Sequence, residues 1–100
     1  MTNQTKMPDE VLHALLEILY YTLISIRSEK NTELTFVLSD HAHNIPHLIG
    51  NYTPGRFRYY WEAERPDFLQ AMEQLDQPVD FFRTHWAALE KHYEILQMET

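Results

Sequence analysis

Four segments of this 100-residue chain repeat side chains at alternating intervals of three and four residues, and this spacing strongly limits how the chain can fold. Residues spaced in this way lie on one stripe of an α-helix. The stripes are Leu12, Leu16, Leu19, Leu23 and Ile26; Leu34, Leu38, His41, Ile45 and Leu48; Phe57, Trp61, Glu64, Phe68, Ala71 and Leu75; and Val79, Phe82, Trp86, Leu89, Tyr93 and Leu96. Four mainly apolar stripes predict an all-α protein.

Breaks in the pattern predict where the helices begin and end. We expect helices over residues 8–30, 33–49, 55–76 and 78–97. Short connections place consecutive helices antiparallel, so the predicted fold is an antiparallel up-down four-helix bundle. Pro46 and Pro66 fall inside the second and third helices, where each removes a backbone donor and predicts a kink.

Length and composition restrict the class of protein. One hundred residues hold a single core, so we expect one helical domain over residues 1–100, with residues 1–7 frayed. The chain has no cysteine, which excludes disulfides and thiolate chemistry and says no more of the compartment than that a reducing one would suit it. We expect a cytoplasmic protein. The most apolar run, residues 11–26, contains His13 and Glu17 and is shorter than the roughly 20 residues of a membrane span.

The charge balance disfavours anionic partners. Eight Lys and Arg against fifteen Asp and Glu give a net charge of −7. Residues 62–100 hold nine of the carboxylates and three of the basic residues, a balance of −6. We therefore expect no binding to nucleic acid or to membranes. The acidic part of the chain is either a solubilising surface or a docking surface for a basic partner.

Two polar residues interrupt the apolar stripes. His41 lies on the second stripe and Glu64 on the third, at similar distances from the turn near Tyr52. In an antiparallel hairpin they come level and face inward, so we predict a buried His41–Glu64 pair with Tyr20 or Tyr21 at the same height. Such a pair either fixes the register of the helices or forms a polar pocket that responds to pH.

A second polar cluster lies beside His41. His43 and His47 are one helical turn apart and Asp40 lies one turn earlier, a spacing that can bind a divalent metal. The strip lies opposite the apolar seam, so we interpret it as a solvated face and expect no metal and no cofactor. The predicted interaction surface joins it to the nearby basic and aromatic run, and comprises Asp40, His43, Asn44, His47, Arg56, Arg58 and Tyr59.

Apolar residues in the first and fourth segments exceed what one stripe per helix can bury. Such a surplus leaves exposed patches unless another chain covers them. We therefore expect a homodimer, although a monomer with a fully central first helix is an alternative. The predicted dimer face comprises Ile18, Phe81, His85, Ala88, His92 and Ile95.

The sequence shows no catalytic constellation. Its serines lie in predicted helices without a strained turn, and it has no glycine-rich phosphate loop. We expect a protein that is not an enzyme and that acts by binding another protein, as inhibitors, adaptors and immunity proteins do. The alternative is a helical bundle that binds a small ligand or a metal through His41, Glu64 and nearby tyrosines.

Overall fold

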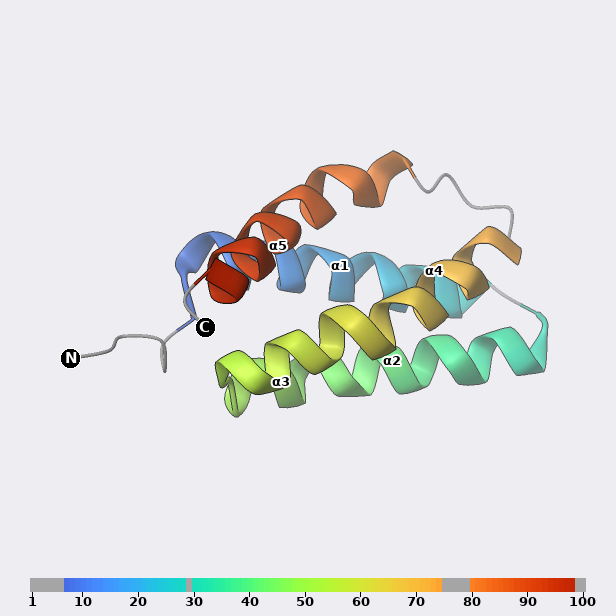
Figure 1. Cartoon of the computed structure of the whole chain (residues 1–100). Coiled ribbons are helices and arrows are strands. Elements are labelled where there is room, and N and C mark those ends of the chain that lie inside the picture. The colour runs from blue at the N-terminus through green and yellow to red at the C-terminus, as the bar shows by residue number, and fades with distance from the viewer. Residues whose placement is uncertain (1–6, 29, 75–79, 99–100) are drawn as a thin grey trace.

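The computed structural model describes residues 7–28, 30–74 and 80–98, with side chains for all of these except residues 28 and 80–83. This part of the chain forms four helices and contains no strand, which confirms the predicted all-α class. They are α1 (Asp9–Ser28), α2 (Thr32–Gly50), a third helix, and α5 (Asp80–Met98). The third helix consists of α3 (Pro54–Tyr59), the π-helical segment η1 (Tyr60–Glu64) and α4 (Arg65–Gln74), which follow one another without a break (Figure 1).

Local side-chain chemistry explains where α2 and α3 begin. The side chain of Asn31 accepts hydrogen bonds from the backbone N–H groups of Glu33 and Leu34, at 3.0 and 3.2 Å. Thr53 does the same for α3, because its hydroxyl accepts from the N–H of Arg56 at 3.0 Å. Pro54 follows at the first helical position, where a missing N–H costs nothing. Both caps satisfy donors that a helix start leaves free.

The two internal prolines have different surroundings. α2 continues through Pro46. In the third helix, η1 ends two residues before Pro66, and the N–H of Arg65 bonds to the carbonyl of Tyr60, five residues earlier. This wide turn lies where Pro66 lacks the N–H that would bond to the Glu62 carbonyl.

The core is formed where α1 packs against both α2 and α5, and α2 packs against α4. In α1 the buried side chains include Val11, Ala14, Leu15, Ile18 and Thr22. The stripe predicted for this segment is therefore wrong: Leu16 and Leu23 are 47% and 48% exposed. Because α1 contacts two helices, its buried arc faces both of them and includes small side chains that allow close approach.

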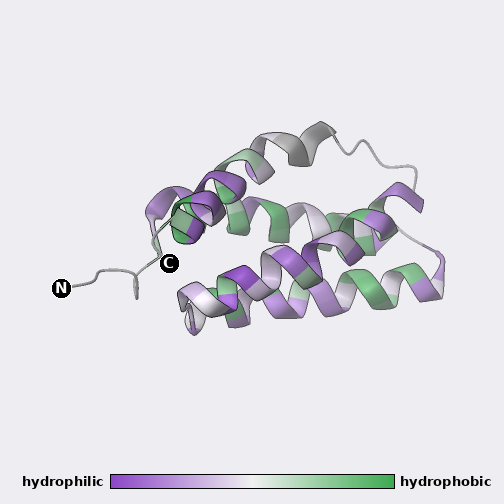
Figure 2. Cartoon of the chain, in the orientation of Figure 1, coloured by the Kyte–Doolittle hydropathy of each residue, from purple (hydrophilic) through white to green (hydrophobic). Residues whose placement is uncertain are grey.

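The other three stripes agree with the prediction at most described positions, but Glu64 and Tyr93 are only half-buried. Every member of the α2 stripe is buried, His41 included, as are Trp86, Leu89 and Leu96 of α5. Figure 2 shows green stretches along α1 and α2, whereas the ribbon from α3 to α4 is largely purple. Met7 was expected to be frayed, but it packs against the core because its apolar side chain is partly buried there. No described helix is both long enough and apolar enough to cross a bilayer.

Candidate functional site

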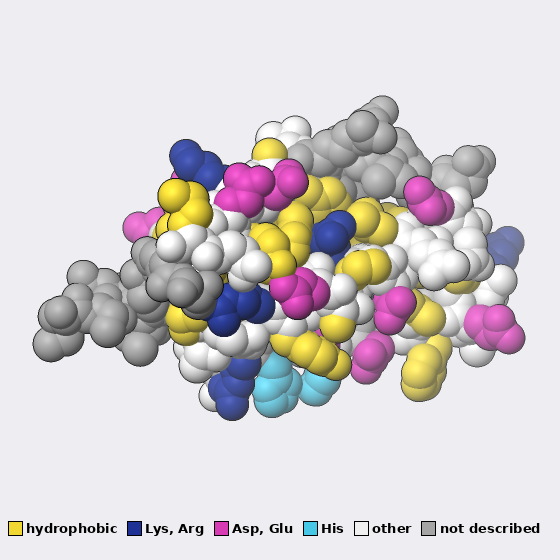
Figure 3. All heavy atoms as spheres, viewed as in Figure 1, with side chains coloured by type: hydrophobic (Ala, Val, Ile, Leu, Met, Phe, Trp, Pro, Cys, Tyr) yellow, Lys and Arg dark blue, Asp and Glu magenta, His cyan; other side chains and the backbone are white. Residues whose placement is uncertain are grey.

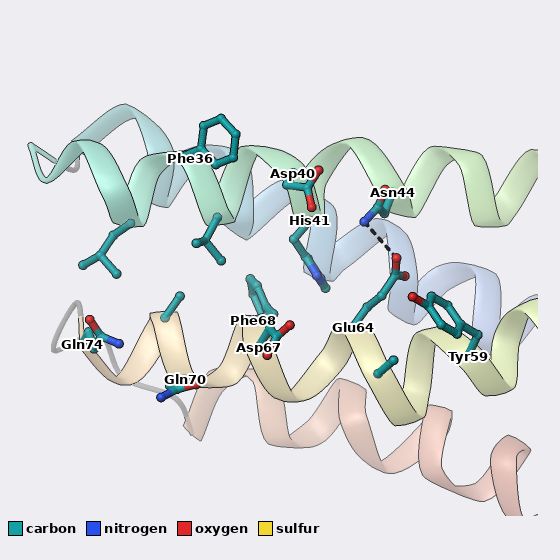
Figure 4. Close-up of a pocket in the computed structure, with 14 residues that line it drawn as sticks. Phe36, Asp40, His41, Asn44, Tyr59, Glu64, Asp67, Phe68, Gln70 and Gln74 are labelled. Carbon is teal, nitrogen blue, oxygen red and sulfur yellow. Dashed lines mark hydrogen bonds between the residues drawn. The ribbon is translucent and has the colours of Figure 1, made fainter.

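A groove lies between α2 and the third helix. Its first half is a cavity of about 440 Å³ between α2 and α4, and its second half is a cavity of about 570 Å³ towards α3. Asn44, Tyr59 and Glu64 line both halves, so the two cavities adjoin. We call this feature the α2–α4 groove. Figure 4 shows Phe36, Asp40 and Asn44 on one side of its first half and Glu64, Asp67 and Phe68 on the other.

His41 closes the floor of the groove. Its side chain is 4% exposed and stacks on Phe68, with ring centroids 4.0 Å apart and planes 16° from parallel. Its Nε2 shares a 3.3 Å hydrogen bond with the hydroxyl of Tyr60. Burial lowers the pKa of His41 to about 3, because a charged imidazolium loses its hydration there. His41 is therefore neutral at physiological pH and does not offset the carboxylates around it.

The predicted pair between His41 and Glu64 does not form. Both side chains line the first half of the groove, but Glu64 accepts a 3.0 Å hydrogen bond from the amide of Asn44. The order of contacts explains this: His41 lies level with Phe68, on which it stacks, and Asn44 lies level with Glu64. Glu64 consequently lies at the edge of the helix facing Asn44, as Figure 4 shows. π-Helical turns occur frequently at functional sites.

The tyrosines expected beside this pair are also elsewhere. Tyr20 is 58% exposed on α1, and Tyr21 packs edge-on against it with ring centroids 5.3 Å apart. Neither lines the groove, because the buried arc of α1 centres on other residues. Tyr60 supplies the phenol next to His41 instead. Burial and then the charge of Glu64 raise the pKa of Tyr60, so this hydroxyl stays protonated.

The first half of the groove is acidic and has apolar walls. Asp40, Glu64 and Asp67 line it, and none of its lining residues is Lys or Arg. Burial and the charge of Asp40 raise the pKa of Glu64, as expected for carboxylates close together. Arg65 follows Glu64 in sequence but does not line the groove: its guanidinium lies 4.1 Å from the ring centre of Trp61. Negative charge in the first half is therefore not neutralised by a Lys or Arg that lines the same half.

The second half of the groove carries the basic residues. Arg56, His47 and Asn51 line it, and Arg56 Nη1 donates to the carbonyl of Asn51 at 2.8 Å. Figure 3 shows this division, with acidic side chains over α2 and α4 and basic ones over α3. Arg58 belongs to another face, because it lies close enough to Tyr93 of α5 to affect the pKa of that hydroxyl. The predicted interaction surface is thus split, and Arg58 lies outside the groove.

The histidine strip on α2 forms an exposed pair. The rings of His43 and His47 lie 5.1 Å apart between centroids. No group of three or more His, Asp or Glu side chains in the described part of the chain could hold a metal ion.

Two residues of the predicted dimer face are buried. Ile18 is fully inaccessible in the core of α1. His92 is 7% exposed, and its Nε2 lies 2.7 Å from the hydroxyl of Tyr52, with which it shares a hydrogen bond. Ala88 and His85 are half-buried and Ile95 is 43% exposed, whereas the side chain of Phe81 lies outside the described residues. The predicted face is wrong at Ile18 and His92, because the chain uses both for its own packing.

Sequence reasoning did not find two important residues of the groove. Neither Tyr60 nor Phe36, which is 76% exposed, was selected as a site residue. Phe36 precedes Asp40 by one helical turn, so both lie on one side of the helix. This alignment was the sequence signal that could have identified Phe36 as a residue of the groove.

Comparison of the chain with protein-family models, with curated proteins and with solved structures finds no match.

Proposed function

We propose that this protein is a small interaction module, and not an enzyme, whose α2–α4 groove binds a segment of another protein. That segment carries a Lys or Arg beside apolar side chains. The supporting observation is the set of three carboxylates, Asp40, Glu64 and Asp67, in a groove half that no Lys or Arg lines. Burial and the charge of Asp40 raise the pKa of Glu64, and a bound cation would offset both of these effects on the Glu64 carboxylate.

Apolar exposure and length support the same occupant. Phe36 is 76% and Val37 is 37% exposed, and both line the acidic half. Exposed aromatic side chains beside charged ones are typical of protein contact surfaces. The lining of the groove extends along α2 from Leu34 to Asn51, which corresponds to about 25 Å at 1.5 Å per residue. This length suits an amphipathic helix of four to five turns or a shorter extended segment.

The architecture we propose for this module is an antiparallel bundle with axis bends near Pro46 and Pro66. The order of cross-helix contacts supports antiparallel neighbours. Along α2, His41 stacks on Phe68 and Asn44 bonds to Glu64, so later residues of α2 contact earlier residues of the third helix. Between the third helix and α5, Phe57 contacts His92 and Phe68 contacts Trp86 in the same reversed order.

The wider biological setting is also a proposal. We infer a cytoplasmic protein that acts as an adaptor, inhibitor or immunity protein, because these classes work by covering a surface of another protein. The net charge of −7 supports a basic protein partner over nucleic acid or an anionic membrane.

A small cationic ligand is the second candidate. A cavity of about 440 Å³ falls within the roughly 300–1,000 Å³ of typical ligand sites. His41 and Glu64, which line this cavity, would then contact the ligand, and Tyr60, in the place expected for Tyr20 or Tyr21, would hold His41 through their shared hydrogen bond. A small ligand would not need Phe36, which is 76% exposed, so the effect of replacing Phe36 separates the two functions.

The test uses a fluorescent amphipathic helical peptide of Leu and Lys as the probe, and a matched peptide of Leu and Glu as its control. We expect the basic peptide alone to bind. Asp40→Asn with Asp67→Asn should raise its Kd about tenfold, equivalent to about 1.4 kcal/mol. Both carboxylates are exposed, so the variant should fold normally.

Two matched variants show whether binding is specific. Glu90→Gln with Glu94→Gln removes the same charge from exposed positions of α5 and should change the Kd less than twofold. Phe36→Ala should weaken binding, whereas Met98→Ala, at a residue that is 84% exposed on α5, should not. Equal losses for the groove and α5 variants would mean that the peptide only senses net charge, and the proposed function would be wrong.

A further inference from the structure

A second surface of the molecule carries an apolar stripe that the groove does not use. Leu16, Tyr20, Leu23 and Ile24 are between 42% and 58% exposed. Their spacing of three and four residues places them on one face of α1, opposite the buried arc that includes Leu15 and Ile18. We call this surface the outer α1 face. Single exposed apolar residues are ordinary, but a contiguous stripe of four marks a contact surface.

We propose that the outer α1 face is an isologous dimer interface, in which α1 packs antiparallel against α1 of a second copy of this chain. This surface is independent of the α2–α4 groove. It also replaces the dimer face predicted from sequence, in which Ile18 and His92 proved to be buried.

The charges of α1 support a second copy as the occupant. Its acidic residues, Asp9, Glu10 and Glu17, lie in its first half, and its basic residue, Arg27, lies in the last turn. The stretch between Glu17 and Arg27 contains no charged residue. A helix with acidic and basic ends separated by an apolar centre is complementary to itself when the second copy runs in the opposite direction.

The register follows from the centre of the stripe. A two-fold axis at Tyr20 places Leu16 of each copy opposite Ile24 of the partner subunit, so the apolar side chains cover one another. Arg27 then lies level with His13 of the partner subunit and within one turn of Glu10 and Glu17 of the partner subunit. A parallel arrangement would place Arg27 beside Arg27 and Glu10 beside Glu10, so charge selects the antiparallel one.

The size of the surface determines how tightly the copies should associate. One helix face is smaller than the roughly 800 Å² per partner of a standard stable interface. We therefore expect a reversible dimer that dissociates on dilution into the low micromolar range and weakens as salt screens Arg27.

Sedimentation velocity or light scattering over a concentration series tests the proposal. The average mass should rise from the 12.0 kDa of one chain towards twice that value. Tyr20→Asp should keep the protein monomeric with its helical circular dichroism unchanged, because Tyr20 is 58% exposed and is not one of the core residues. Phe36→Asp, which places the same charge in the groove, should leave the dimer intact.

Disulfide trapping tests the register, because the chain has no cysteine of its own. Under mild oxidation Tyr20→Cys should cross-link across the two-fold axis, whereas Leu16→Cys and Arg27→Cys should not. Cross-linking at all three positions would show a parallel arrangement and overturn the proposal. The proposal would also be overturned if the protein stayed monomeric at every concentration, or if Tyr20→Asp left the dimer unchanged. A monomer that bound phosphatidylcholine vesicles through the outer α1 face would overturn it as well.

Discussion

Replacing His41 with Leu should make the stability of the protein much less sensitive to acid. In the folded chain burial lowers the pKa of His41 to about 3, whereas an exposed histidine has a pKa of 6.5. Below pH 6.5 the unfolded chain therefore takes up a proton that the folded chain excludes, and stability falls. Each pH unit between these two values costs about 1.4 kcal/mol, so acidification to pH 5 removes about 2 kcal/mol. This is a large part of the roughly 5–15 kcal/mol that stabilises a typical domain.

The titratable neighbours of His41 do not reverse this sign. Tyr60 stays protonated throughout the acidic range, because burial and Glu64 raise its pKa. Burial and Asp40 raise the pKa of Glu64, so the folded chain takes up a proton at Glu64 more readily than the unfolded chain does. That opposite contribution is present in the wild-type protein and in the His41→Leu variant, and it cancels when the two are compared.

The assay is urea unfolding followed by circular dichroism at pH 7 and at pH 5. The wild-type protein should lose about 2 kcal/mol more than His41→Leu between these two pH values. His43→Leu is the matched control, because His43 lies on the same helix and is exposed. Its pH dependence should follow that of the wild-type protein. If His41→Leu and the wild-type protein show the same pH dependence, His41 is not buried in the neutral form and our description of the groove floor is wrong.

Two further predictions concern packing. Leu15→Ala should lower the free energy of unfolding by about 2–5 kcal/mol, because Leu15 is fully buried. Leu16→Ala should lower it by less than about 1 kcal/mol in dilute protein, because Leu16 is 47% exposed. Equal losses for the two variants in urea unfolding would contradict the assigned buried face of α1. Tyr52→Phe should lower stability by about 1 kcal/mol through loss of the 2.7 Å hydrogen bond to His92. A second Tyr52→Phe measurement in a His92→Phe background should show a smaller loss, and an undiminished loss would show that the two side chains are not coupled.

Periodicity predicted α2 well because that helix is clearly amphipathic. Leu34, Leu38, His41, Ile45 and Leu48 form the one mainly apolar stripe spaced in this way, and all five are buried. The boundaries expected at residues 33 and 49 each differ by one residue from those of α2 in the structure.

The same reasoning was wrong for α1 because that helix is apolar nearly all round. Leu12, Leu16 and Leu19 repeat with the same spacing as Val11, Leu15 and Ile18, so periodicity alone cannot select the buried face. The choice depends on α2 and α5, which both pack against α1, and this arrangement is a property of the whole fold.

Part of the groove was visible in the sequence. The position of His41 and Glu64 on two facing stripes placed both side chains in one region, and both line the same cavity. Their actual partners are Tyr60 and Asn44, which the apolar stripes did not single out. Pro66 predicted an irregularity in the third helix, but not a π-helical turn over residues 60–64 or a bond between Glu64 and Asn44.

The most direct test of the groove as a binding surface is a nuclear magnetic resonance titration of the ¹⁵N-labelled protein with the basic amphipathic peptide. We predict that the largest amide shifts occur along α2 at Val37, Asp40 and Asn44 and along the third helix at Glu64 and Asp67. These shifts should disappear together in the Asp40→Asn, Asp67→Asn variant. Shifts that instead concentrate on α5, or on the outer α1 face around Tyr20, would contradict the assignment of the groove.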